Sequence, residues 1–147
     1  MNRAAILAAI PALLTLSACQ QGEDAGNVPG DASDTHAFDG IGEHDVVRFT
    51  GTEPFWGGQV AGTSLTYSTP ENIDGETITV TRFAGRGGLS FSGNLDGRPL
   101  DLAITPGDCS DGMSDRSYPF VATLQLGSEQ RNGCAWREGI DDLGPQP

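Results

Sequence analysis

The residues with the clearest chemical potential lie between positions 108 and 118. Three carboxylates, those of Asp108, Asp111 and Asp115, stand within eight residues, with serine hydroxyl groups near them. Oxygen ligands of this kind suit calcium and other hard cations. The spacing, however, lacks the alternating acids and the terminal Glu of an EF-hand. Asp and Ser also form turns by bonding their own backbone. We therefore interpret the segment as a structural turn, with a divalent-cation site as the alternative.

A second unusual segment is GTEPFWGG, residues 51–58, in which a carboxylate, Glu53, precedes the adjacent aromatic residues Phe55 and Trp56. Such a group could form a recognition edge. We favour the interpretation that one of the two aromatic rings plugs an end of the core and that Glu53 is a turn residue, with the recognition edge as the alternative. From both segments, the candidate binding residues are Glu53, Phe55, Trp56, Asp111, Ser114 and Tyr118.

The inventory of reactive side chains argues against an enzyme. The chain has no lysine, and its two histidines, His36 and His44, lie before the expected domain. This excludes Ser-His and Cys-His nucleophiles, Schiff-base chemistry and the usual zinc ligands from the domain. Only a carboxylate pair remains, Asp111 with Asp115 or Glu53. We expect a non-catalytic protein with no cofactor and no bound metal.

The charge balance limits the partners. The formal net charge is −12, which argues against nucleic acid, because phosphates require basic patches. It favours basic proteins, lysozyme among them, or divalent cations. Solubility alone is the alternative reason for the acidity.

The N-terminus predicts export. Asn2 and Arg3 precede an apolar run of 13 residues, 4–16, which is too short to span a bilayer, and two small residues then lead to Cys19. Residues 1–18 are thus a signal peptide. The stretch 16–19 resembles the lipobox of bacterial lipoproteins, which implies cleavage before Cys19 and its diacylation. Gln20 then implies delivery to the outer membrane. An ordinary cleaved signal is the alternative.

The other two cysteines, Cys109 and Cys134, form an even pair in an exported and therefore oxidising setting. We predict a disulfide, which would close a loop of about 25 residues and stabilise the fold by roughly 3–4 kcal/mol. Two free thiols or a metal pair is the weaker alternative, since no histidine lies nearby.

The elements that must position these residues are strands. Apolar residues alternate with polar ones in many segments, and Asp96-Gly97 and Gly127-Ser128 suit type I′ and II′ hairpin turns. This pattern predicts that residues 45–138 form an all-β domain, either a small antiparallel barrel or a compact sandwich. It follows a disordered acidic tether, 19–44, and precedes a flexible tail, 139–147. The eight expected strands are 46–50, 55–60, 64–68, 76–84, 88–95, 99–105, 118–126 and 131–137.

Three blocks carry a family resemblance: GTEPFW (51–56), CSDGMSDRSYPF (109–120) and GCAW (133–136). In this order behind a lipobox, they resemble an uncharacterised family of bacterial envelope lipoproteins. Its members often carry such blocks beside META-type or lysozyme-inhibitor-type domains. The resemblance implies a location in the cell envelope and supports the Cys109–Cys134 bridge, but it implies no activity.

A second resemblance concerns residues 114–118. Lipoprotein inhibitors of animal-type lysozyme are small β-barrels that insert a Ser-Gly-x-x-Tyr loop into the enzyme's cleft. Ser114 and Tyr118 match that loop, but Asp115 replaces the glycine and adds a negative charge. That charge would repel the carboxylates of a glycosidase cleft, whereas the net charge would attract a basic lysozyme.

Together these observations predict a lipid-anchored, non-catalytic binding module of the bacterial cell envelope, at the outer membrane and facing the periplasm. Its partners would be the membrane, through the anchor, and an envelope protein or a basic protein. The alternatives are an inhibitor of lysozyme-type glycosidases and a divalent-cation-binding envelope protein.

Overall fold

The computed structural model describes residues 35–144, which form nine strands and no helix. The expected signal peptide, Cys19 and most of the expected tether lie outside these residues. No helix within 35–144 has the length and apolar character needed to cross a lipid bilayer. The strands are β1 (Val46–Thr52), β2 (Phe55–Ala61), β3 (Ser64–Thr69), β4 (Asn72–Thr79), β5 (Thr81–Ala84), β6 (Leu89–Leu95), β7 (Arg98–Cys109), β8 (Tyr118–Leu126) and β9 (Glu129–Arg137).

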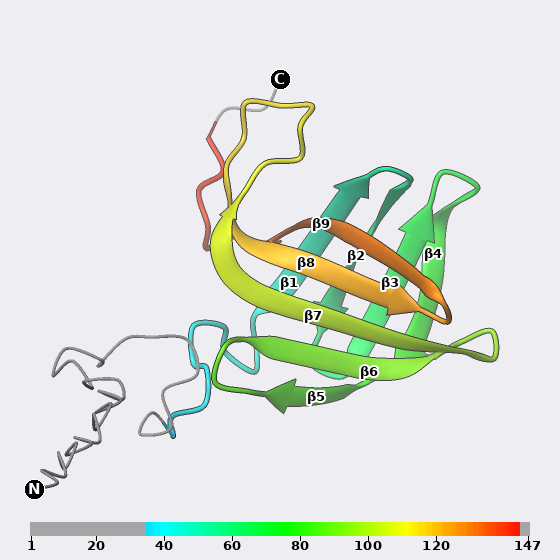
Figure 1. The fold of residues 1–147 in the computed structure, drawn as a ribbon, viewed down its shortest axis with the longest axis horizontal. Helices are drawn as coiled ribbons and strands as arrows, with labels where there is room; N and C mark the ends of the chain where they lie inside the picture. The colour runs from blue at the N-terminus through cyan, green and yellow to red at the C-terminus, as the bar shows by residue number, and fades with distance from the viewer. Residues whose placement is uncertain (1–34, 145–147) are drawn as a thin grey trace, which may run out of the picture. The chain divides into compact units, whose positions relative to one another are not determined.

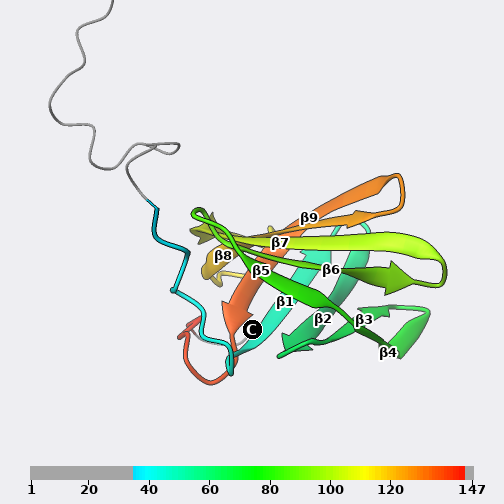
Figure 2. The same ribbon diagram turned by 90° about the horizontal axis from the view of Figure 1, so that it is seen from below.

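All nine strands belong to one antiparallel sheet with the order β4-β3-β2-β1-β9-β8-β7-β6-β5. The chain forms two meanders, β1–β4 and β5–β9, and the last strand pairs with the first. Figure 1 shows the sheet curled into a half-barrel, and Figure 2 shows the two meanders facing each other. The all-β, barrel-like class expected from the alternating pattern is confirmed.

The expected strand 76–84 is two strands in the structure. β4 pairs with β3, β5 pairs with β6, and Val80 lies between them. Its backbone N–H donates to Thr63 O at 2.9 Å, and its side chain is buried in the core. The chain therefore changes partner at Val80, and the count is nine strands rather than eight. A hydrophobic pattern cannot reveal this change, because the alternation continues across it.

The core lies inside the curl. The nine residues of β8 alternate strictly between buried and half-buried, so one face of the strand supplies the core with five side chains, those of Tyr118, Phe120, Ala122, Leu124 and Leu126. The other strands contribute similarly, and burial of their apolar area is the main stabilising term, at about 25 cal/mol per Å².

Two hairpin turns agree with the expected turn types. Asp96 and Gly97 have φ values of 51° and 78°, and positive φ at both central residues defines type I′. Gly127 has a φ of 60° and opens the two-residue β8–β9 connection, as type II′ requires.

The folded region begins earlier than the expected boundary at residue 45. Residues 38–45, here called the strap, lie against the sheet. Phe38 N–H donates to Gly85 O at 2.7 Å, Ile41 is only 2% exposed, and Arg82 Nη2 donates to Ile41 O at 2.8 Å. The expectation of disorder through residue 44 therefore fails for this segment. The composition of this segment hides two apolar residues that pack on the sheet, Ile41, which is buried, and Phe38, which is half-buried.

The start of the expected flexible tail is also ordered. Arg137 and Asp141 form an ion pair, with Nη2 and Oδ1 2.6 Å apart, and Arg137 Nη1 donates to Gly40 O at 3.1 Å. Arg137 thus connects the end of β9 to both the strap and residue 141.

Candidate functional site

Both segments singled out in the sequence lie near the carboxyl end of β1. The β1–β2 hairpin holds Glu53, Pro54 and Phe55, and the loop 110–117 connects β7 to β8. Thr52 Oγ1 donates to Asp111 O at 3.2 Å, so the hairpin and the loop touch. The candidate binding side chains nevertheless do not gather into one group, because the sheet directs them to different environments.

Asp111 organises the loop around its carboxylate. Oδ1 accepts the backbone N–H groups of Met113 at 2.9 Å and Ser114 at 2.8 Å. Oδ2 accepts the hydroxyl groups of Ser114 at 2.8 Å and Tyr118 at 2.9 Å. The carboxylate thus bonds its own loop, which is the turn-forming role that Asp plays in such segments.

These bonds change the titration of both partners. The backbone N–H groups of Met113 and Ser114 hold the pKa of Asp111 well below its usual range, because they bond the charged form. Burial raises the pKa of Tyr118, and its bond to the Asp111 carboxylate raises it further. At neutral pH the loop therefore holds an anionic Asp111 and a neutral Tyr118 that donates to it.

Tyr118 is buried, and Ser114 is half-buried with its hydroxyl group bonded within the loop. Tyr118 is 4% exposed, and its ring packs against Trp136 with centroids 5.4 Å apart. Ser114 Oγ donates to Asp111 and accepts the backbone N–H of Arg116 at 3.3 Å. Within residues 35–144, no group of three or more His, Cys, Asp or Glu side chains is placed to hold a metal ion.

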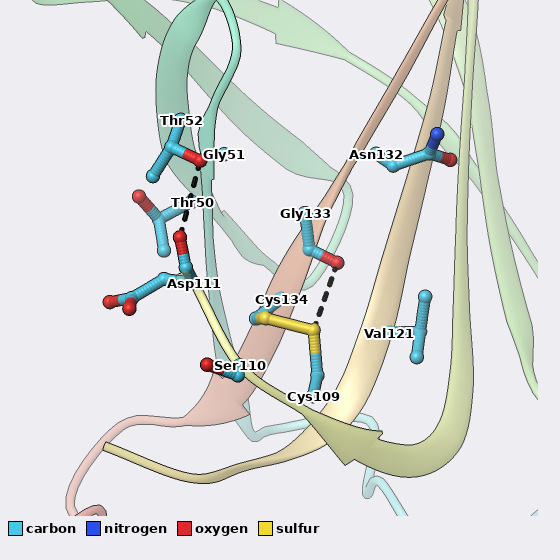
Figure 3. A pocket seen from close by; sticks show the side chains of 10 residues that line it. All are labelled: Thr50, Gly51, Thr52, Cys109, Ser110, Asp111, Val121, Asn132, Gly133 and Cys134. Carbon is cyan, nitrogen blue, oxygen red and sulfur yellow. Dashed lines mark hydrogen bonds between the residues drawn. A yellow bond between two sulfur atoms is a disulfide. The ribbon is translucent and has the colours of Figure 1, made fainter. Parts of the chain in front are cut away.

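The predicted disulfide between Cys109 and Cys134 is confirmed, with a Cα–Cα distance of 5.6 Å. It joins the end of β7 to β9 beside a hollow of about 220 Å³, shown in Figure 3, where the pairing of β1 with β9 ends. Gly133 is required there. A Cβ at this position would lie 2.1 Å from Thr50 O, so only glycine lets the two strands approach so closely.

Adjacent residues of β2 point to opposite faces of the sheet. Phe55 is 53% exposed, whereas Trp56 is 3% exposed and packs between Phe49 and Tyr67, at centroid distances of 5.5 and 6.4 Å. Gly51 makes room for the indole, since a Cβ there would lie 2.0 Å from Trp56 Nε1. Trp56 is therefore a core residue, and it cannot share an exposed edge with Phe55.

Phe55 lines two open hollows of about 260 and 390 Å³ at the ends of the β1–β2 and β3–β4 hairpins. These hairpin ends lie side by side at the top of Figure 1. Ile73, at the start of β4, is 81% exposed and borders the first hollow. We call this region the Phe55 surface, defined by Pro54, Phe55, Thr69, Pro70 and Ile73.

Arg131 borders the Phe55 surface from β9. Its Nη1 donates to Tyr67 OH, and its Nη2 lies 2.8 Å from Glu129 Oε2. Burial raises the pKa of Tyr67, and the nearby Arg131 opposes this rise. Arg131 thus connects β9 to β3, and its charge is already paired with Glu129.

Sequence analysis missed Pro70, Ile73 and Arg131. The strand period does place Phe55 and Trp56 on opposite faces once β2 is assigned, so that part of the site was accessible from the sequence. Ile73 lies 18 positions from Phe55 in the chain. Only the adjacency of the two hairpins brings the two residues together.

The comparisons with known proteins give no relative. No family model, no curated protein and no solved structure matches this chain.

Proposed function

We propose that this chain is a lipid-anchored, non-catalytic protein of the bacterial cell envelope, and that its β-domain binds another macromolecule through the Phe55 surface. The observation that carries the proposal is the exposure of two large apolar side chains, Phe55 and Ile73, beside preformed hollows. Contiguous exposed apolar groups on a soluble domain are typical of interaction sites, and aromatic anchors supply much of the binding energy in interfaces.

The rigid setting of Phe55 supports the proposal. Its neighbour Trp56 is fixed in the core, and β2 pairs on both sides, with β1 and β3. An anchor held in this way loses little conformational entropy when it binds.

The environment of Asp111 supports a non-catalytic role. A general acid at neutral pH needs a raised pKa, whereas four hydrogen bonds hold the pKa of Asp111 low. The same bonds occupy Ser114 and Tyr118, the two residues on which the lysozyme-inhibitor alternative depends. An inserting loop would have to give up these bonds, so we place the interaction at Phe55 instead.

Site-specific photo-crosslinking in cells tests the proposed surface. We expect p-benzoylphenylalanine at position 55 of the full chain to give a discrete adduct with one partner. Phe83 is the matched control, because it is also a phenylalanine, is 66% exposed and lies on β5, outside the hollows. Adducts of equal yield at positions 55 and 83, or none at position 55, would refute the proposal.

The anchor requires a test of its own. Cys19→Ser should abolish incorporation of labelled palmitate and release the protein from the membrane fraction. Incorporation that persists in this variant would show that Cys19 is not the lipidated residue.

A further inference from the structure

Three acidic residues are close in sequence to residues of the Phe55 surface. Glu53 lies two residues before Phe55, Glu71 borders the larger hollow, and Asp74 follows Ile73. All three are exposed, and none forms an ion pair within residues 35–144. The neighbouring cation, Arg131, is paired with Glu129. We call these three residues the rim, and they place unpaired negative charge next to the apolar residues of the Phe55 surface in the chain.

From this arrangement we infer that the occupant of the Phe55 surface is a basic protein segment that carries an apolar side chain beside Lys or Arg. The apolar side chain would contact Phe55 and Ile73, and the cations would pair with Glu53, Glu71 and Asp74. Such complementarity raises the association rate and selects against other partners. The inference rests on the proposed function and adds the chemistry of the partner.

The same rim disfavours two other occupants. The headgroups of anionic lipids would be repelled by the three carboxylates. Two copies of this chain joined at the Phe55 surface would bring like charges together, because a two-fold interface places the same patch on both subunits. The chain enters the sheet from the strap, at the start of β1, whereas the Phe55 surface lies at the other end of β1 (Figure 1).

Selection from a random-peptide phage library against the immobilised full chain tests the inference. We expect the enriched peptides to combine Lys or Arg with an aromatic or aliphatic residue. A synthetic peptide of the consensus sequence should bind about tenfold more weakly to Phe55→Ser, the loss of one interface anchor. It should bind Phe83→Ser as tightly as the original chain.

A triple variant tests the role of the charged rim. It combines Glu53→Gln, Glu71→Gln and Asp74→Asn. These exposed side chains make no ion pair within the described residues, so the fold should tolerate the changes. Affinity for the peptide should fall, and its dependence on salt should weaken, because screening acts on the removed charges.

Several outcomes would overturn the inference. They are enriched peptides without basic residues, unchanged affinity in the triple variant, Phe55-dependent sedimentation with vesicles that contain phosphatidylglycerol, and a dimer that Phe55→Ser dissociates. If position 55 still gives a protein adduct in cells, the proposed function stands and only the basic partner is wrong. If position 55 gives no adduct, the proposed function fails as well.

Discussion

At the scale of the residue, Asp111 shows how a cluster of acids can be structural. Asp108 and Asp115 are exposed, whereas the carboxylate of Asp111 accepts four hydrogen bonds from its own loop and from Tyr118. Three acids in the sequence therefore correspond to one loop-forming residue and two exposed ones.

Asp111→Asn should destabilise the domain by about 1–2 kcal/mol at neutral pH. The amide keeps one acceptor, but its NH₂ group faces hydroxyl groups that donate in the native loop. The carboxylate is only partly buried, so the lower part of this range is expected. Urea unfolding followed by tryptophan fluorescence measures the change. Asp115→Asn is the matched control, because Asp115 is exposed and should change little.

The stability that Asp111 contributes should depend on pH, and the same variant tests this. Hydrogen bonds lower the pKa of Asp111 in the folded chain relative to its ordinary value of 3.8. Its contribution to stability is therefore complete above about pH 4 and declines as the pH falls below that value. The difference in unfolding free energy between the original chain and Asp111→Asn should stay constant from pH 7 to about pH 4 and shrink as the pH falls further to about pH 3. A difference that does not shrink below about pH 4 would contradict the assignment.

At the scale of the element, the strap adds a buried apolar residue to the sheet from outside it. Ile41 belongs to the core cluster, and Phe38 packs edge-on against Phe120 with ring centroids 6.4 Å apart. Arg82 and Arg137 bond the carbonyl groups of Ile41 and Gly40. These contacts make the strap part of the domain's stability.

Ile41→Ala should therefore lower the free energy of unfolding by about 2–4 kcal/mol, the usual cost of emptying a buried isoleucine site. Ile73→Ala is the matched control, since Ile73 is 81% exposed and its change should remain within about 0.5 kcal/mol. Thermal unfolding of both variants measures the contrast. Equal losses would mean that the strap does not contribute to the folded state in solution.

The elements also show which parts of the structure the sequence could predict. Alternation and turn chemistry identified the strand segments and the Asp96-Gly97 and Gly127-Ser128 hairpins, because these signals are local. The change of partner at Val80 and the docking of the strap depend on contacts between distant segments. The same holds for the Phe55 surface. Phe55 was a candidate, but Ile73 became its neighbour only through the sheet.

At the scale of the whole molecule, the disulfide ties together β7 and β9, two strands that β8 separates in the sheet. β1 pairs with β9 from Val47 to Thr50, and the Cys109–Cys134 bridge lies at the end of that pairing. The bridge spans a sequence separation of 25 residues. It therefore ties β7 and the loop 110–117 to β9 at the residue where the pairing of β9 with β1 begins.

Replacing both Cys109 and Cys134 by alanine should reduce the stability of the domain by about 3–4 kcal/mol, because the unfolded chain regains the entropy of the open loop. Urea unfolding of this variant should match that of the original chain under reducing conditions. A midpoint that neither reduction nor substitution changes would show that the bridge adds no stability.

The pairing of β1 with β9 has a kinetic consequence. Val46 O accepts the backbone N–H of Glu138, and Arg48 bonds Glu138 across 90 positions of sequence. Such distant contacts give a high relative contact order, and domains of this kind complete folding in milliseconds to seconds. Until β9 pairs with it, β1 presents an unpaired edge, so the partly folded domain is exposed to edge-to-edge aggregation before this last pairing forms.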